Sequence, residues 1–306
     1  MNIASPQSDL SSINNKQSKG KLMPVMSKQT TKKVQPRTKT KTTNISSRVI
    51  ALEDLPDEGI KLCVYGASGT GKTRFISTFA KKGKLLHMIC SSNGMNEARS
   101  IKGVKGIDCF EILKPNDLPD LIDYAISNKY KTIALDHVTG FCDLVLATIM
   151  GVERLPEQKS WGMTDRSDYQ QMGLQVKTYL RELMSVDCNV IIAGQERAFN
   201  TSDEGYDGIL MPYVSVACTP SVAGWIAPAV DYLCQTFKRD EVVIKSKKVG
   251  DKVIKKSEKT GRVEYGLRVG PDAVFTTKFR VPPDTELPDV VINPTYDKIS
   301  HLIEGA

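Results

Sequence analysis

The fold is decided by the stretch "KLCVYGASGTGKTRFISTFAKKG", residues 61–83. It joins a short apolar run, a glycine-rich turn and a segment whose apolar residues recur at helical spacing, which predicts a strand, a loop and a helix. The turn "GASGTGKT" at 66–73 matches the phosphate-loop pattern G-x-x-x-x-G-K-[ST] in full. Because a strand precedes it and an amphipathic helix follows it, the motif has the context it requires. The sequence therefore predicts a site for nucleotide phosphates here.

Each position of this loop has a chemical task. Its glycines permit tight backbone geometry, and the N–H groups at the start of the helix form an anion-binding concavity. Lys72 is expected to contact the β- and γ-phosphates of ATP, and the Thr73 hydroxyl to bind Mg²⁺. The predicted cofactor-binding residues are Gly66, Ala67, Ser68, Gly69, Thr70, Gly71, Lys72 and Thr73.

Two later apolar runs end in polar residues. "KTIALD" (131–136) ends in Asp136, which we expect to hold Mg²⁺ through water, although an acid at this point can also simply cap a helix. "CNVIIAGQ" (188–195) ends in Gln195, which we expect to sense the γ-phosphate or the attacking water. The alternative for Gln195 is a polar residue satisfied at a strand end, and Glu196 follows it as a weaker candidate.

The order of elements predicts an α/β fold: a mainly parallel sheet flanked by helices, with a C-terminal antiparallel extension. The longest helix is expected at 167–185, with Tyr169 and Met172 among the apolar residues that face the core. The extension contains an excursion at 238–262, with ten Lys and Arg residues against four acids, and a strand at 274–281. The expected parallel strands lie at 61–65, 84–90, 108–113, 131–136 and 188–195. A helix is expected at 117–128, between the third and the fourth of these strands.

The net charge of +7 is unevenly distributed. Residues 1–50 hold ten Lys and Arg residues and one acid, so the other 256 residues carry a net charge of −2. This polar segment has too little apolar surface to offset the entropy of ordering, so we expect a disordered basic tail followed by one domain over 51–306. The tail is either a salt-sensitive arm for nucleic acid or a solvated segment without a partner.

Cysteine usage and hydropathy exclude several classes of protein. Seven single cysteines without a CxxC pair, together with only three histidines, argue against a structural zinc site and suit a reducing compartment. We therefore expect a protein of the cytoplasm. The uncharged stretch Gly208–Val230 contains three prolines, so it predicts a loop and a short helix rather than a membrane span.

Taken in order, the phosphate loop, "TIALD", a long helix and "VIIAGQE" followed by a long loop resemble the RecA-like ATPase core. The narrower resemblance, over about residues 58–304, is to the short RecA-like single-strand annealing proteins of phages. It implies ATP and Mg²⁺ as cofactors, ATP hydrolysis, recombination or annealing of DNA, and a homo-oligomer that binds single-stranded DNA. A single-strand-binding or replication protein would be a further partner, no membrane is implied, and the protein would act in the cytoplasm of a phage's bacterial host.

The resemblance also implies roles for individual residues. The family has a pair of cations on a late strand that reaches the γ-phosphate in the neighbouring subunit, and Lys278 and Arg280 of "TTKFR" match that spacing. The alternative is two solvated surface cations. The family's glutamate after the second strand is missing from "MICSSNGMNEA" (88–98). Either Glu97 or Glu196 substitutes for it, or hydrolysis is slow.

In proteins of this type, single-stranded DNA contacts the segments that follow the two strands after the phosphate loop. Here these are about 138–165 and 197–219, which we expect to be loops; Arg197, Phe199 and Tyr213 offer the cations and aromatic rings that such a groove needs. Two other functions remain open. One is a nucleotide-dependent switch or loader with little ATPase activity, which recruits a replication or packaging partner. The other is a RecA-like helicase.

Overall fold

The computed structural model describes residues 49, 51, 59–152, 164–200, 212–249, 252–283 and 285–304, and only the backbone of 244–249 and 252–256. Within this part of the chain, nine strands form one sheet in the order β11-β9-β8-β1-β5-β4-β2-β3, with β10 also paired to β8. The parallel strands are β1 (Lys61–Gly66), β2 (Leu85–Ile89), β3 (Ile107–Glu111), β4 (Thr132–Asp136), β5 (Asn189–Gly194) and the first residues of β8 (Tyr232–Val249).

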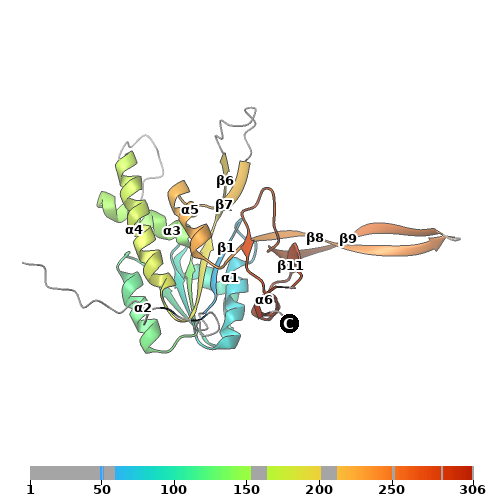
Figure 1. The fold of residues 1–306 in the computed structure, drawn as a ribbon, viewed down its shortest axis with the longest axis horizontal. Coiled ribbons are helices and arrows are strands. Elements are labelled where there is room, and N and C mark those ends of the chain that lie inside the picture. The colour runs from blue at the N-terminus through green and yellow to red at the C-terminus, as the bar shows by residue number, and fades with distance from the viewer. Residues whose placement is uncertain are drawn as a thin grey trace, which may run out of the picture. The chain divides into compact units, whose positions relative to one another are not determined.

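Helices cover both faces of the parallel strands (Figure 1). On one face pack α2 (Asp117–Ser127), α3 (Val138–Met150), α4 (Arg166–Met184) and α5 (Pro220–Ala229). The other face is covered by α1 (Lys72–Ser77), the 3-10 helix η3 (Thr78–Lys82) that continues it, and α6 (Tyr296–Glu304).

Alternation along the strands explains why both faces are apolar. In β1, Cys63 and Tyr65 pack on the α3–α4 side, whereas Leu62 and Val64 pack on the α1 side. Successive side chains of a strand point to opposite faces, so a strand covered on both sides must be apolar at nearly every position. This arrangement confirms the α/β fold that the sequence predicts.

The antiparallel extension is also confirmed. β9 (Lys252–Arg268) pairs with β8, and β11 (Val290–Ile292) pairs with β9. Beyond Lys238, β8 pairs only with β9 among the described strands, so the two continue as a ribbon that we call the arm, residues 238–249 and 252–264 (Figure 1). The arm coincides with the basic excursion at 238–262.

Three expectations were wrong. Residues 138–150 form α3 rather than a loop, because Val138, Phe141, Cys142 and Val145 recur at helical spacing and are buried. The segment 197–219 is not simply a loop either, since β6 (Glu196–Asn200) pairs with β7 (Pro212–Val216). Tyr169 is 46% exposed and faces away from the core that Met172 joins.

The strand expected at 274–281 is reduced to β10 (Lys278–Phe279). β10 pairs with Leu233 and Tyr232 of β8, next to the point where the pairing of β9 with β8 ends at Gln235. Only this short length of the β8 edge is open to a further strand. Within the described residues, no helix is long and apolar enough to cross a membrane, and the uncharged stretch around 208–230 contains β7 and the short helix α5.

Candidate nucleotide site

The predicted phosphate loop runs from the end of β1 into the start of α1. Gly69 and Gly71 have φ of 75° and 90°, a region that favours glycine. A Cβ on Gly66 would lie 2.3 Å from Thr236 Oγ1 of β8, so the loop backbone approaches the neighbouring strand as closely as it can. Thr70 Oγ1 is 2.7 Å from Thr236 Oγ1, and this contact fastens the loop to β8.

Lys72 lies under the loop and is 7% exposed. Its Nζ donates to the carbonyl oxygens of Gly66 at 2.7 Å and Ala67 at 3.0 Å, and lies 3.4 Å from Gln195 Oε1. Burial lowers the pKa of Lys72, an effect opposed by the nearby carboxylates of Asp136, Glu196 and Glu97. The ammonium group is therefore held at the loop by weak neutral partners that phosphate oxygens can replace.

Asp136, at the end of β4, meets the first turn of α1. Thr73 Oγ1 donates to Asp136 Oδ2 at 2.7 Å, and His87 Nε2 of β2 lies 3.2 Å from the same oxygen. Burial alone would raise the pKa of Asp136, but the hydrogen bonds from His87 and Thr73 outweigh it and keep this pKa below its ordinary value. The carboxylate is thus ready to accept a cation.

These two residues fit the magnesium ion that the sequence predicts. A hydroxyl and a carboxylate oxygen are the hard donors that Mg²⁺ prefers, and such sites take most other ligands from phosphates and water. Among the described residues, no cluster of three or more His, Cys, Asp and Glu side chains could hold a metal ion. A site built for Mg²⁺ carried by a nucleotide needs no such cluster.

β5 lies between β1 and β4, so Gln195 at its end is placed between the phosphate loop and Asp136. The Gln195 N–H donates to Thr139 Oγ1 at 3.2 Å. His137 is the N-cap of α3, its Nδ1 accepting from the Gly140 N–H, and the Asp136–His137 peptide bond is cis. The cap role considered for Asp136 thus belongs to His137.

The two candidate glutamates have different surroundings. Glu97, on the 3-10 helix η4 (Gly94–Ile101), lines the same cavity as the phosphate loop, Asp136 and Gln195. Glu196 Oε2 instead accepts a hydrogen bond from Gln235 Nε2 at 3.0 Å. Of the two, Glu97 is the one that faces the space where the phosphates would lie.

Lys278 and Arg280 lie elsewhere, at the C-terminal end of α5. Lys278 Nζ donates to the carbonyl oxygens of Ala227 and Pro228, both at 3.3 Å, and of Val230 at 2.5 Å. Arg280 pairs with Asp231 at 2.5 Å. Neither cation lines the cavity at the phosphate loop of its own chain. Action on a neighbouring subunit therefore stays a prediction.

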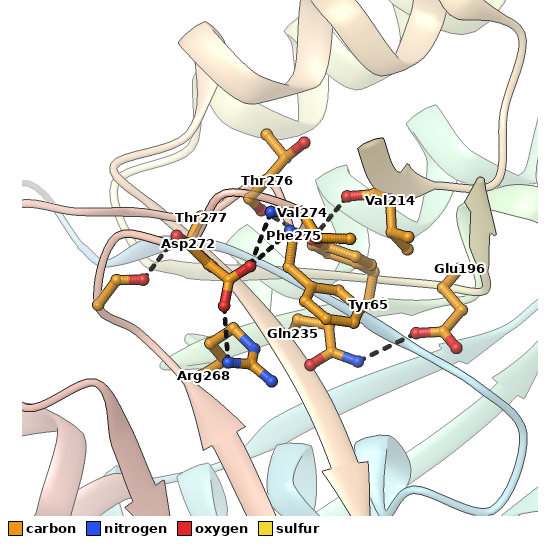
Figure 2. Close-up of polar contacts among 11 residues, drawn as sticks. Tyr65, Glu196, Val214, Gln235, Arg268, Asp272, Val274, Phe275, Thr276 and Thr277 are labelled. Atoms are coloured by element: carbon orange, nitrogen blue, oxygen red, sulfur yellow. Dashed lines mark hydrogen bonds and ion pairs between the residues drawn. The ribbon is translucent and has the colours of Figure 1, made fainter. Parts of the chain in front are cut away.

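A hydrogen-bonded network joins β1, the strand that leads into the phosphate loop, to the segment before Lys278 (Figure 2). The Tyr65 hydroxyl lies 2.8 Å from Thr276 O and 3.1 Å from Val214 O of β7. Asp272 accepts from the N–H groups of Val274 and Phe275. These contacts connect β1, the β6–β7 hairpin and residues 272–277 in one place.

The two aromatic rings of the β6–β7 hairpin, Phe199 and Tyr213, stack on each other. Phe199 is 8% exposed, and its ring stacks on Tyr213 with centroids 5.2 Å apart. Phe199 is therefore a core residue in this conformation rather than the base-stacking surface expected from the sequence, whereas Arg197 is exposed. Residues 153–163 and 201–211, which form part of the two predicted DNA-binding segments, lie outside the described residues.

Sequence reasoning missed two residues at this site. His87 lies inside the apolar run "LLHMI" and is fully buried beside Asp136; a histidine in a buried strand was its only signal. Tyr265, on β9 at the root of the arm, lines the cavity at the phosphate loop. Nothing local in the sequence indicates that position, because it depends on the pairing of β9 with β8.

Comparison with known proteins bears on this geometry. A family model described as an AAA domain matches residues 58–263, which is more than half of the chain and includes the phosphate loop, Asp136 and Gln195. The chain belongs to this AAA-domain family. Its fold is that of a nucleotide-binding AAA-type P-loop ATPase, a fold that implies use of a nucleotide and usually of Mg²⁺.

Similar solved structures include a KaiC-like protein from the hyperthermophilic archaeon Pyrococcus horikoshii OT3. It is 11% identical with a TM-score of 0.35, covering 79% of this chain and 93% of that one. The RadB recombinase is 12% identical with a TM-score of 0.36, covering 68% of this chain and 87% of its own. No curated protein matches this AAA-domain chain.

Proposed function

We propose that this AAA-domain protein is a Mg²⁺-dependent ATPase that binds single-stranded DNA and acts as a homo-oligomer in phage-type DNA recombination or annealing. The observation that carries the proposal is the convergence of Lys72, Thr73, Asp136 and Gln195 at the ends of three adjacent strands. Positions for a triphosphate, a metal ion and a water molecule follow from that convergence.

The residues divide the work as follows. The loop N–H groups and Lys72 hold the β- and γ-phosphates, and Lys72 exchanges the Gly66 and Ala67 carbonyls for phosphate oxygens. Thr73 and Asp136 hold Mg²⁺, which neutralises charge that develops on the phosphate oxygens. His87 keeps the Asp136 carboxylate in place from below. Gln195, between the loop and Asp136, orients the water that attacks the γ-phosphorus.

Glu97 is proposed to accept the proton of that water. Attack forms the new P–O bond, the bond between the γ-phosphorus and the bridging oxygen breaks, and ADP and inorganic phosphate leave. The carboxylate of Glu97 lines the cavity, whereas that of Glu196 is bonded to Gln235. We therefore assign the proton-accepting role to Glu97 rather than to Glu196.

Single-stranded DNA is proposed to contact the basic arm and the β6–β7 hairpin. The hairpin begins at Glu196, directly after Gln195, so a strand bound there lies next to the γ-phosphate position. The arm adds a run of lysines at 245–256 with few acids to balance them. Backbone contacts of this kind release counterions, so binding should weaken steeply with salt.

A second candidate is a nucleotide-dependent switch with little ATPase activity that recruits a replication or packaging partner. Two observations favour it. The family's glutamate after β2 is absent, and both proposed finger cations are bonded within their own subunit. In this case ATP would bind without a response to DNA, and the basic tail would carry the partner contact.

The test is ATP hydrolysis with and without single-stranded DNA at several salt concentrations. Lys72→Ala serves as the site control, and replacement of Lys245, Lys247 and Lys248 by Gln neutralises part of the arm. DNA stimulation that fades with salt, and a smaller salt slope for the arm variant, support the proposal. ATP binding without any DNA response supports the switch instead. An unchanged salt slope removes the arm from the DNA site.

A further inference from the structure

The cavity at the phosphate loop is larger than a triphosphate needs. Its volume is about 880 Å³, in the range of sites that enclose whole ligands. Beyond the loop it extends past Arg74 of α1 and Thr78 of η3 to the turn Asn293–Thr295 and to Val263 and Tyr265 of β9. A nucleotide whose phosphates lie on the loop would extend its ribose and base along this length.

The far wall is built by the root of the arm. A Cβ on Gly71, where α1 begins, would lie 3.3 Å from Cδ1 of Tyr265, and one on Gly69 would lie 4.0 Å from Nζ of Lys238. The Tyr265 ring therefore lies against the loop itself. Tyr265 is 36% exposed, so part of its ring is open to the cavity.

The other aromatic side chain of this wall is not available. Phe75 lines the cavity but is 2% exposed, and its ring packs edge-on against Phe79 with centroids 5.6 Å apart. Among the described Phe, Tyr and Trp residues that line the cavity, Tyr265 alone offers a free ring surface. Stacking on an aromatic ring is a common way for proteins to hold a base.

The turn beside Tyr265 is held in a defined position. The Asn293 N–H donates to Tyr265 O at 2.7 Å, which bonds the turn to β9. The N–H of Tyr296, the residue directly after the turn, donates to Thr78 Oγ1 of η3 at 2.8 Å. Asn293 itself has a positive φ of 48°. Its carboxamide is exposed and makes no hydrogen bond with another described side chain, and it has the donor and acceptor that a base edge requires.

We propose that Tyr265 and Asn293 form the site for the base of the nucleotide, with the Tyr265 ring stacked on the base and the Asn293 amide bonded to its edge. This inference rests on the proposed function of the pocket and adds its base subsite. Because Tyr265 belongs to β9, the same strand that continues into the basic arm, the bound base contacts the arm at its root.

The experiment measures binding of ATP, GTP and inorganic tripolyphosphate in the presence of Mg²⁺. Loss of one base–aromatic stack weakens binding about 5- to 150-fold. We expect that loss for Tyr265→Ala with ATP and no change with tripolyphosphate, while Tyr265→Phe binds as the unmodified protein does. Asn293→Ala should change the ratio of ATP to GTP affinity. Tyr124→Ala, at an exposed tyrosine on α2, is the matched control.

The outcomes separate the two ideas. If the unmodified protein binds neither ATP nor tripolyphosphate, the proposed function fails. The second case is that the unmodified protein binds ATP and that Tyr265→Ala binds both ATP and tripolyphosphate with the affinity of the unmodified protein. The base subsite is then overturned, whereas the proposed function stands. A triphosphate of 2-aminopurine gives a second readout, since stacking quenches its fluorescence. Quenching that persists in folded Tyr265→Ala would also overturn the assignment.

Discussion

Replacing Tyr65 with phenylalanine tests whether the network in Figure 2 holds the phosphate-loop strand to the β6–β7 hairpin. The ring is fully buried, so the substitution removes only the hydroxyl and leaves the packing intact. Val214 O keeps its bond from the Thr276 N–H at 2.9 Å. Within the described contacts, Thr276 O accepts from Tyr65 alone and would be left unpaired.

The expected cost follows from that difference. A hydrogen bond contributes a net ~1 kcal/mol to the free energy of unfolding, and leaving a fully buried acceptor unpaired raises the loss to about 1–3 kcal/mol. Because Thr276 O is partly buried, we expect a loss toward the lower end of that range, about 1–2 kcal/mol. Urea denaturation measures this directly. Tyr232→Phe is the matched control: Tyr232 is 8% exposed, and its hydroxyl bonds to no described residue, so its loss should change stability by less than about 0.5 kcal/mol.

Hydrogen exchange locates the effect. The N–H groups of Val214 and Thr276 should exchange faster in Tyr65→Phe, whereas those of the distant β2–β3 pair should change only as global stability does. Equal stability of Tyr65→Phe and Tyr232→Phe, or faster exchange spread evenly over the sheet, would refute the view that this hydroxyl joins the two segments.

Three further predictions follow. Glu97→Gln should lower kcat about 10²- to 10⁴-fold with ATP affinity unchanged, as expected on loss of a general base, and Glu196→Gln should lower it less; the reverse order in steady-state kinetics would move the role to Glu196. Mixing Lys278→Ala with Lys72→Ala subunits should restore part of the DNA-stimulated activity that each lacks, because a trans finger from one variant can serve the intact loop of the other; no recovery in the mixed assay would argue against action in trans. The pKa of Asp272 is lowered by the N–H groups of Phe275 and Val274, so its stabilising effect is complete above the ordinary carboxyl pKa of about 3.9 and disappears as pH falls through the lowered value. The stability difference between the parent and Asp272→Asn should therefore shrink in acid, and a difference independent of pH in denaturant titrations would contradict this account.

The sequence predicts the parts of the site that depend on local pattern. The phosphate loop, the buried strands and the acid that ends β4 are each encoded within a few neighbouring residues, and the parallel arrangement follows from their alternation with helices. Helix α3 could also have been predicted, since Val138, Phe141, Cys142 and Val145 recur at helical spacing. It was expected to be a loop because the resemblance to RecA-like proteins placed a DNA-binding segment there.

Other parts depend on which strands become neighbours. His87 meets Asp136 because β2 pairs with β4, and Tyr265 reaches the phosphate loop because β9 pairs with β8 and β8 with β1. No local pattern specifies these pairings. The length of β10 also depends on strand pairing, because β10 can pair with β8 only beyond the place where β9 stops pairing with β8.

The position of Lys278 is compatible with a role in a neighbouring subunit. Its Nζ bonds three carbonyl oxygens at the end of α5, a favourable place for a cation that contributes about 0.3–1 kcal/mol at a partly exposed helix terminus. Burial and the nearby Arg280 lower the pKa of Lys278, and the carboxylate of Asp231 opposes this shift. A triphosphate offers several negative charges and shorter, charge-assisted hydrogen bonds. A finger role therefore requires Lys278 to exchange the three carbonyl oxygens at the end of α5 for phosphate oxygens of the neighbouring subunit. The mixed assay of Lys278→Ala and Lys72→Ala subunits measures whether that exchange takes place.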